Sequence, residues 1–569
     1  MSDRLRTRLV AVPCSGISRE VRLLWISVLA LSLGACGGGG HGDSATPVTS
    51  PSPSPSPSPS PSPSPAVVTQ WGTVSEPAWP SALCATLSAT LTAASGSIDA
   101  ADSDPTRSQP DTLRIQEAIS ACPSGQAVKL VPSDSGQGAF LSGPLSLKSG
   151  VQLWIDKDVT LFASRNPRDF DNGVGTCGTA TSSSTTSCKP FIQANSTSDS
   201  GLIGAGIIDG RGGSLLTNGP NAGLRTWWDV AYQNKTQGLN QQNPRLVQVT
   251  GGARFTLHGL TVQNSPNFHI VTSGVSGVTA WGIRVLTPSL AYTRSGYACE
   301  AGTTPDVVTP ATCFTPDTAK NTDGFDPGQS SQVLLAYSFI STGDDDVAVK
   351  AHGKPSSGQL NFSHNHFYYG HGLSIGSETD AGLSNMIVDD LSIDGYDSPN
   401  GNGLRIKSDS SRGGNVSGVT YSSICMRNVR RPLVFDPFYS SSTGSLFPDF
   451  SGIVIHGFHF LGSGAFAGGL MDFAGYEAKG QNNPLVITLD NVVFDGAQPT
   501  FDSGHNGGPA TLPAATHFTL GSGAVSFSSS LVASSSRDVT VIGVPGASPA
   551  VDCSQAFVPL SAVLATSPI

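Results

Sequence analysis

The 569-residue sequence contains few charged residues. Asp, Glu, Lys and Arg make up 13% of the chain, against roughly 25% in an ordinary globular protein. Aromatic residues are also scarce, at 7%, whereas glycine is abundant, with 66 residues. A protein built from long charged helices would not have this composition, but short strands joined by many turns would. The composition therefore indicates an all-β protein.

The chain also lacks an excess of positive charge, because its formal net charge is −10. This charge gives no reason to expect binding to nucleic acid or to an anionic membrane surface. Any anionic substrate would have to be held by a local cluster of Lys and Arg side chains.

Cysteine patterns typical of metal sites are absent. The sequence has no CxxC and no Cys/His spacing of a zinc site, so we expect no metal and no cofactor. Ten cysteines are present, two of them within the first 36 residues. An even number of remaining cysteines in an exported chain suggests disulfides. Pairing neighbours would give Cys84–Cys122, Cys177–Cys188 and Cys299–Cys313, and would leave Cys425 with Cys553.

The sequence has one long hydrophobic run, LLWISVLALSLGA at residues 23–35. This run follows a basic region and is too short for a comfortable membrane span, so we predict a signal peptide over residues 1–35. It closes on LGAC, which resembles a bacterial lipoprotein cleavage box and would make Cys36 the lipidated first residue of the mature chain. Ordinary secretory cleavage nearby is the alternative.

Residues 36–72 are predicted to be a linker. A Gly-rich stretch is followed by alternating Ser and Pro at residues 51–65, and such a segment favours extended, semi-rigid polyproline II geometry. An anchor followed by a spacer suits a folded domain, here residues 73–569, held away from a surface. We therefore expect an exported protein, either a cell-surface or outer-membrane lipoprotein or a secreted one.

From about residue 110, short apolar strands alternate with polar turns, as in GLIGAGIIDGRGG at residues 201–213. Repeats of this length predict a solenoid. One segment reads as a helix, at residues 111–122, with Leu113, Ile115 and Ile119 assigned to one face. We predict a parallel β-helix whose open end is capped by this helix.

Polar landmarks recur at a spacing that suits one coil each. Asp323, Asp345, His371 and Arg405 follow one another at intervals of 22, 26 and 34 residues. Stacked coils would place them above one another, roughly 4.8 Å per step. The same face would then also carry Asp344 and Lys407.

Side-chain parity tests this arrangement. If the apolar residues of LRIK at residues 404–407 point into the coil, both cations point outward. Strict alternation back from Val347 would turn Asp345 inward, which is costly for a charged carboxylate. We therefore predict a bend at residues 343–346, with regular alternation starting at Val347. His371, between two glycines, requires a similar bend.

The predicted column combines carboxylates, an imidazole and fixed cations. Glycoside hydrolysis needs a protonated acid at the leaving oxygen and an ionised carboxylate that activates water or attacks carbon. Crowded carboxylates can supply both states, because repulsion raises the pKa of one of them. Arg405 and Lys407 would pair with a carboxylate on the substrate.

Four sequence blocks carry a family resemblance: NTDGFDP, GDDD, GHGLSIGSE and GLRIKS, starting at residues 321, 343, 370 and 403. In this order and spacing they resemble the signature blocks of the polygalacturonases of glycoside hydrolase family 28, in particular bacterial endopolygalacturonases. The resemblance covers about residues 80–460. It implies a right-handed parallel β-helix and hydrolysis of α-1,4-galacturonosyl bonds of polygalacturonate with inversion.

The resemblance also implies a role for each matching residue. Asp344 corresponds to the general acid, Asp323 and Asp345 to the pair that activates water, and His371 to the histidine that tunes the acid. Arg405 and Lys407 match subsite cations, and Tyr439 matches a tyrosine that contacts substrate. Asp346 departs from the family pattern, and we interpret it as a solvated residue where the bend ends.

Alternative functions remain open from the sequence. An exo-acting galacturonosidase, or a rhamnogalacturonan or xylogalacturonan hydrolase, would use similar residues. A non-catalytic surface β-helix, serving as an adhesin or a carbohydrate-binding protein, would be expected to lack some of the acids. The expected partner is pectin polysaccharide, bound by a monomer.

Overall fold

The computed structural model describes residues 65–462, 464–501 and 513–565. All of them belong to one compact unit, Pro63–Ile569. The predicted signal peptide, Cys36 and the linker as far as residue 64 lie outside the described residues. Within the described part of the chain, no helix has the length and apolar character needed to cross a membrane.

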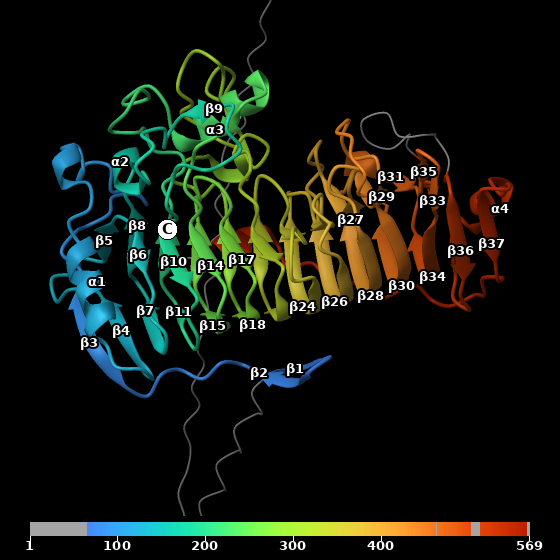
Figure 1. Cartoon of the computed structure of the whole chain (residues 1–569), viewed down its shortest axis with the longest axis horizontal. Coiled ribbons are helices and arrows are strands. Elements are labelled where there is room, and N and C mark those ends of the chain that lie inside the picture. Colours follow the sequence, from blue (N-terminus) through green and yellow to red (C-terminus); the bar gives the residue numbers. More distant parts are fainter. Residues whose placement is uncertain (1–64, 463, 502–512, 566–569) are drawn as a thin grey trace, which may run out of the picture. The chain divides into compact units, whose positions relative to one another are not determined.

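The described unit is a right-handed parallel β-helix, as predicted (Figure 1). One of its sheets has 11 parallel strands. In spatial order they are β6 (Leu145–Ser146), β10 (Ile192–Asn195), β14 (Val247–Thr250), β17 (Ile270–Ser273), β20 (Phe325–Gly328), β23 (Val347–Val349), β25 (Leu373–Ile375), β27 (Asn402–Lys407), β29 (Arg431–Asp436), β31 (Leu470–Phe473) and β35 (Thr500–Phe501).

A second, 20-stranded sheet forms the rest of the coil wall. Its strands are β3 (Leu83–Ser88), β4 (Gln126–Val131), β5 (Ala139–Ser142), β7 (Val151–Ile155), β8 (Thr160–Ala163), β11 (Gly201–Gly204), β12 (Ile207–Asp209), β15 (Ala253–His258), β16 (Thr261–Gln263), β18 (Ser276–Trp281), β19 (Arg284–Leu286), β21 (Ser331–Ala336), β22 (Phe339–Ser341), β24 (Ser357–Tyr368), β26 (Leu383–Asp394), β28 (Asn415–Arg427), β30 (Asp449–Leu461), β34 (Leu485–Phe494), β36 (Thr516–Leu520) and β37 (Val539–Ile542).

Several short strands and helices lie outside these two sheets. The remaining strands form three antiparallel pairs: β1 (Ala66–Thr69) with β2 (Gly72–Ser75), β9 (Ala180–Thr181) with β13 (Asn240–Gln241), and β32 (Tyr476–Ala478) with β33 (Gln481–Asn483). The α-helices are α1 (Thr112–Ala121), α2 (Pro167–Phe170), α3 (Trp227–Gln237), α4 (Ser528–Ala533) and α5 (Leu560–Ala565), with 3₁₀ turns at Pro105–Arg107, Ser295–Tyr297 and Gly464–Phe466.

The strand register stacks equivalent residues from coil to coil. Leu373 lies beside Leu404, and Leu404 beside Leu433, and all three are fully buried in the coil interior. Arg405 follows Leu404 in the strand and points to the outer face, as parity predicted. Burial of each leucine contributes roughly 1.5–3 kcal/mol, so the apolar ladder sets which side chains face outward.

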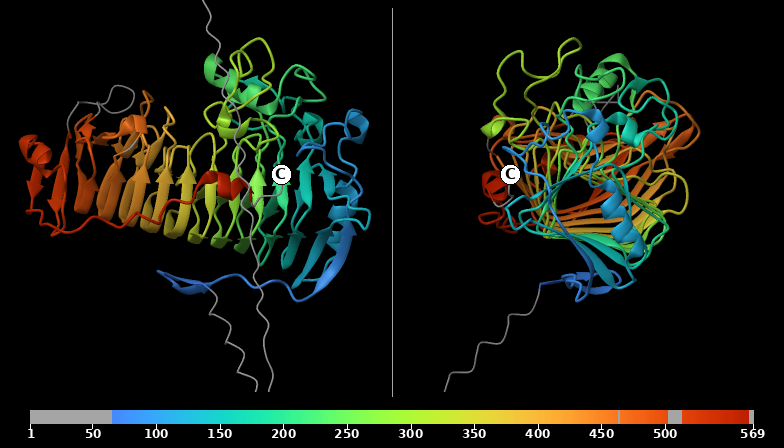
Figure 2. Two further views of the ribbon diagram at one scale, coloured as in Figure 1. Left: turned by 180° about the vertical axis from the view of Figure 1, so that it is seen from behind. Right: turned by 90° about the vertical axis from the view of Figure 1, so that its left-hand side faces the viewer.

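The predicted capping helix is present as α1, which lies across one end of the coil (Figure 2, right). Ile115 and Ile119 are buried against the first coils. Leu113, which the pattern assigned to the same face, is instead 70% exposed. Two residues along a helix correspond to a rotation of about 200°, so Leu113 lies on the opposite side from Ile115.

The four expected disulfides are all present, and one of them secures the C-terminal tail. After β37 the tail runs back along the outside of the coils (Figure 2, left). Cys553 bonds to Cys425, and the Tyr368 hydroxyl donates a 2.8 Å hydrogen bond to the Val558 carbonyl. Closure of so long a loop restricts the unfolded chain. Four disulfides fit an exported protein.

The first described strand lies before the predicted domain boundary at residue 73, and the second crosses it. The hairpin of β1 and β2 occupies residues assigned to the linker. Val67 is buried together with Trp281 and Leu334, and Trp71 packs against the same cluster. These apolar side chains explain why the segment follows the coil wall.

Candidate active site

The predicted site residues lie at neighbouring coils on the outer face of the 11-stranded sheet. Asp323 precedes β20, the three aspartates at residues 344–346 lie between β22 and β23, and His371 precedes β25. The predicted bend is present, because β22 ends at Ser341 and β23 begins at Val347. The structure therefore brings the three predicted acids, the histidine and the two cations to one region.

Asp345 is the most firmly held carboxylate. It is buried, and its Oδ1 accepts hydrogen bonds from Ser374 Oγ at 2.9 Å and from the Arg405 guanidinium. Its Oδ2 accepts from Lys407 Nζ at 2.8 Å. Burial alone would raise the pKa of Asp345, but Lys407 and Arg405 lower it to about 2. Asp345 is therefore ionised at any ordinary pH.

Asp344 contacts the imidazole of His371 and reaches the surface. Its side chain is 18% exposed, and Oδ1 lies 3.1 Å from His371 Nδ1. Burial would raise the pKa of Asp344, yet the charge and the hydrogen bond of His371 hold it well below its ordinary value. Lys407 and Lys235 act in the same direction. The 3.1 Å separation of His371 Nδ1 and Asp344 Oδ1 is short enough for a proton to pass between the two groups.

This result corrects the expected cause of protonation. Repulsion between neighbouring acids was expected to keep Asp344 protonated, whereas the contact with His371 favours its ionised form. Asp323 instead has the higher pKa. It is buried, which together with Asp344 and Asp345 raises its pKa to about 6 against the opposing charge of Lys350. Of the three predicted acids, Asp323 is the one that titrates near neutral pH.

Asp346 is not a solvated residue, so that interpretation is wrong. Its carboxyl is buried and accepts a 3.2 Å hydrogen bond from the backbone N–H of Gly372. Burial raises its pKa well above the ordinary value. The bend turns the Asp346 side chain against Gly370. A Cβ added to Gly370 would lie 2.5 Å from the Asp346 carboxyl oxygen. The glycine before His371 therefore makes room for Asp346.

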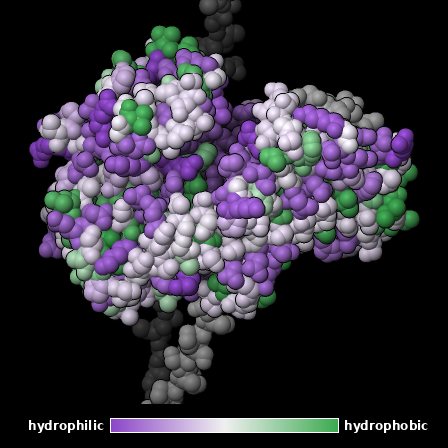
Figure 3. All heavy atoms as spheres, in the orientation of Figure 1, coloured by the Kyte–Doolittle hydropathy of each residue, from purple (hydrophilic) through white to green (hydrophobic). Residues whose placement is uncertain are grey.

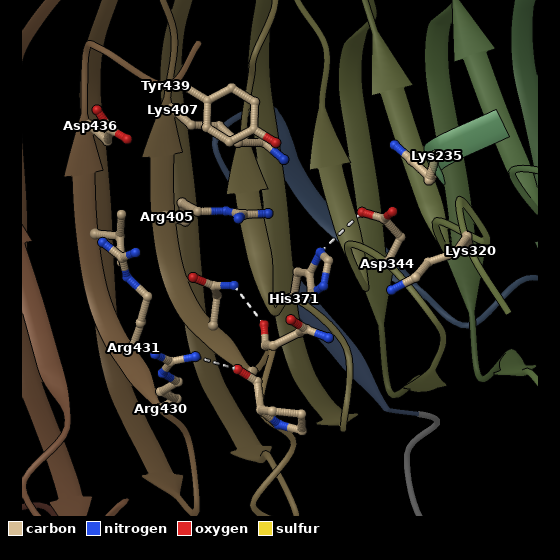
Figure 4. A pocket seen from close by; sticks show the side chains of 15 residues that line it. Lys235, Lys320, Asp344, His371, Arg405, Lys407, Arg430, Arg431, Asp436 and Tyr439 are labelled. Atoms are coloured by element: carbon tan, nitrogen blue, oxygen red, sulfur yellow. Dashed lines mark hydrogen bonds and ion pairs between the residues drawn. The ribbon is translucent and has the colours of Figure 1, made fainter. Parts of the chain in front are cut away.

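A cleft of about 440 Å³ opens beside Asp344 and His371 (Figure 4). Figure 3 shows a hollow with many hydrophilic side chains between the loops around α3 and those near β29. Cationic side chains come from both of its walls. They are Lys235, Lys320, Arg405, Lys407, Arg430 and Arg431, against the two acids Asp344 and Asp436. This charge balance suits a polyanionic ligand.

Four of these cations were missed from the sequence. Arg430 and Arg431 had a usable signal, because Arg431 follows Arg405 by 26 residues, about one coil, although its partner in the register is Asn402. Lys235, on α3, and Lys320, in the loop before β20, had none. Both come from insertions whose path does not follow the coil repeat. In Figure 4 they lie on the Asp344 side of the cleft.

Tyr439 lies at the cleft beside Lys407, where the resemblance placed a substrate-contacting tyrosine. Lys407 Nζ is 5.1 Å from the centre of the tyrosine ring. The Tyr439 backbone N–H donates a 2.9 Å hydrogen bond to the Ser408 carbonyl, which fixes the start of this loop. An aromatic ring next to a cation offers a sugar both a stacking face and a charge.

The same acids do not suit a metal ion. Ligand atoms of Asp344, Asp345 and His371 lie within 4.8 Å of one another, which is close enough for a shared cation. Both oxygens of Asp345, however, already accept hydrogen bonds from Arg405 and Lys407. Two fixed positive charges beside the ligands disfavour a further cation.

Comparisons with known proteins agree with this geometry. The family model "Glycosyl hydrolases family 28" matches residues 127–462. A polygalacturonase of Ralstonia nicotianae is 66% identical over 507 residues, covering 89% of this chain and 95% of its own. An endo-polygalacturonase of Pectobacterium carotovorum is 40% identical over 421 residues, covering 74% and 88%. The solved polygalacturonase of Erwinia carotovora superposes with a TM-score of 0.62 at 37% identity, covering 75% of this chain and 96% of its own.

Proposed function

This chain belongs to glycosyl hydrolases family 28, and we propose that it is an endo-acting polygalacturonase, which cleaves α-1,4-galacturonosyl bonds within polygalacturonate. One observation carries the proposal: a cationic cleft has the Asp344–His371 pair in its wall and ionised Asp345 directly behind it. The relatives named polygalacturonase and endo-polygalacturonase support it.

The cations of the cleft would bind the carboxylates of successive galacturonate units. Arg405 and Lys407 both point toward the acids, and in the free protein they hold Asp345. A substrate carboxylate at this position would share these two cations with Asp345. Arg430 and Arg431 would contact sugars farther along the cleft. Ion pairs of this kind position a flexible chain for reaction.

The bond is cleaved by attack of water on the anomeric carbon. As the glycosidic C–O bond breaks, the leaving oxygen takes the proton supplied by Asp344, which shares it with His371. Asp323 and Asp345 hold the water and accept its proton. Asp323 is the better acceptor, because its pKa of about 6 lies nearer the working pH than that of Asp345, which is held at about 2.

A single assay tests the activity and its mode. We expect the purified protein to lower the viscosity of polygalacturonic acid rapidly while releasing few reducing ends. Release of monomer with little change in viscosity would indicate an exo-acting enzyme. A preference for rhamnogalacturonan or xylogalacturonan would point to those hydrolases. Binding without any bond cleavage would point to the non-catalytic adhesin or carbohydrate-binding protein.

The export signal, the lipid anchor and the linker at the N-terminus are also proposals. We place a signal peptide at residues 1–35, lipidation at Cys36 and a linker before the β-helix, on the basis of the LGAC sequence and the Ser-Pro repeat. We also propose that the protein acts as a monomer, because residues of one chain line the cleft on both walls.

Cell fractionation tests the lipid anchor. In a bacterial host we expect the full-length chain in the membrane fraction and Cys36→Ser in the soluble fraction. Cys14→Ser, within the signal peptide, is the matched control and should fractionate like the unaltered chain. An unaltered chain found entirely in the soluble fraction would favour ordinary secretory cleavage.

A further inference from the structure

Lys350 connects the candidate active site to the neighbouring coil. It follows β23 directly, and its Nζ lies 2.8 Å from Asp323 Oδ2 and 3.3 Å from Asp326 Oδ2. The same ammonium group lies 4.1 Å from the centre of the Phe268 ring. The side chain is 26% exposed. Contacts with two carboxylates and an aromatic face leave it little freedom to move.

Asp323 depends on Lys350 for its hydrogen bonding. The carboxyl is buried, and its Oδ1 accepts no hydrogen bond from the described residues. Arg405 and Lys407 contact Asp345 instead. Within the described ranges, Lys350 is therefore the cation that contacts Asp323, and it does so from the side away from Oδ1.

We propose that Lys350 is a positioning residue for the reaction: it keeps Asp323 ionised and contacts only Oδ2, so that Oδ1 is not occupied by a hydrogen bond from the described residues. The inference rests on the proposed function, in which Asp323 accepts a proton from that water. Asp323 must be ionised to do so, and a buried carboxylate without a cation loses this form readily.

The charges around Asp323 and Lys350 explain why the Lys350 cation is needed to keep Asp323 ionised. Asp323 is influenced by three other acids, Asp326, Asp344 and Asp345. Arg245 is a further cation near these acids, but among the described residues Lys350 is the one that contacts Asp323 and Asp326 directly. Lys350 in turn is influenced by Glu378. Arg405 and Lys407 offset the charge of Asp345, and burial raises the pKa of Asp326 well above its ordinary value. Removal of Lys350 therefore takes away the contacting cation that favours ionised Asp323.

The backbone at Asp323 is supported independently of the Lys350 side chain. His269 donates its backbone N–H to the Asp323 carbonyl at 2.8 Å, and Gly324 donates its own to the Asp345 carbonyl at 2.9 Å. The Lys350 backbone N–H donates to Pro327 at 3.1 Å, and this bond survives any substitution of the side chain. A variant at Lys350 should therefore retain the coil while changing the charge next to Asp323.

The test is the pH profile of kcat on polygalacturonic acid. Asp323 must be ionised, so activity is present above its pKa and is lost as pH falls through it. Removing the cation raises this pKa. We expect the acidic limb of Lys350→Met to move to higher pH by about one unit or more, with KM changed less than about twofold, since Lys350 does not line the cleft. Lys350→Arg should restore most of the original limb.

A matched control is available elsewhere on the coil. Lys129 pairs with Asp156 at 2.9 Å and lies 4.5 Å from the ring of Trp154, much as Lys350 lies between its acid and Phe268. Lys129→Met should keep the original pH profile. Circular dichroism checks the fold, and Lys350→Gln serves as a second neutral variant if Lys350→Met does not fold.

The outcomes separate the two proposals. An unaltered protein that does not cleave polygalacturonic acid would refute the proposed function. Cleavage by the unaltered protein, with unchanged acidic limbs in the folded neutral variants, would overturn the role of Lys350 alone. A shift of the limb that Lys350→Arg reverses and Lys129→Met lacks would support it.

Discussion

Replacing Asp344 by Asn is expected to lower kcat on polygalacturonic acid by about 10³-fold, because a positioned proton donor contributes roughly 10²–10⁴-fold to such a reaction. The amide cannot give a proton to the leaving oxygen, although it can still contact His371. KM should change little, since the binding cations of the cleft remain. Release of reducing ends at saturating substrate measures the loss.

The neighbouring Asp346 is a matched control in the same run of aspartates. It is buried, which raises its pKa well above the ordinary value and favours the neutral carboxyl, and Asn is neutral and nearly the same size. We expect Asp346→Asn to keep kcat within a few-fold of the original value. Full activity in Asp344→Asn would remove Asp344 from the role of acid. Equal losses in both variants would show that the bend, rather than the proton, limits the reaction.

Much of this site could be predicted because the β-helix repeats regularly. Once each coil contributes one strand to the 11-stranded sheet, spacing alone brings Asp323, Asp345 and His371 together. Parity then separates Arg405 from the buried Leu404 and Ile406. These inferences need only the two-residue period of a strand and the cost of burying charge.

Other features depend on parts of the chain that have no repeat. The direction of the Asp346 side chain follows from the local bend, and a glycine in the next coil could not reveal it in advance. Lys235 and Lys320 reach the cleft from insertions, and their positions depend on how those loops pack. Lys350 closely follows the three aspartates in the sequence, but its ion pair with Asp323 can be identified only from the distance between the two side chains.

The order of the pKa values was also beyond the sequence, because it depends on which cation contacts which acid. Asp345 contacts the cations Arg405 and Lys407, and Asp344 contacts the imidazole of His371. Asp323 contacts Lys350, which it shares with the neighbouring acid Asp326. The three carboxylates are close neighbours, although Asp344 is more exposed than the other two. Their hydrogen-bond partners therefore decide the protonation states from which the reaction starts.

Replacing Lys407 by Met is expected to lower kcat/KM on polygalacturonic acid by about 10²-fold, since a charge-assisted hydrogen bond contributes roughly 1.5–3 kcal/mol. Two effects combine. The cleft loses a cation that binds the substrate carboxylate, and Asp345 loses its 2.8 Å partner. Burial then raises the pKa of Asp345 with Arg405 and His371 left to oppose it, so the acidic limb of kcat should also move to higher pH.

Substrate charge separates these effects. On highly methylesterified pectin the sugar carboxylates are neutral, so Lys407→Met should lose less of its kcat/KM than on polygalacturonic acid. Arg430, exposed at the far part of the same cleft, provides the comparison. Arg430→Met should raise KM only a few-fold and leave the pH profile unchanged, because it does not contact Asp345. Equal losses on both substrates for Lys407→Met would contradict substrate binding by Lys407 and leave it only the role of holding Asp345.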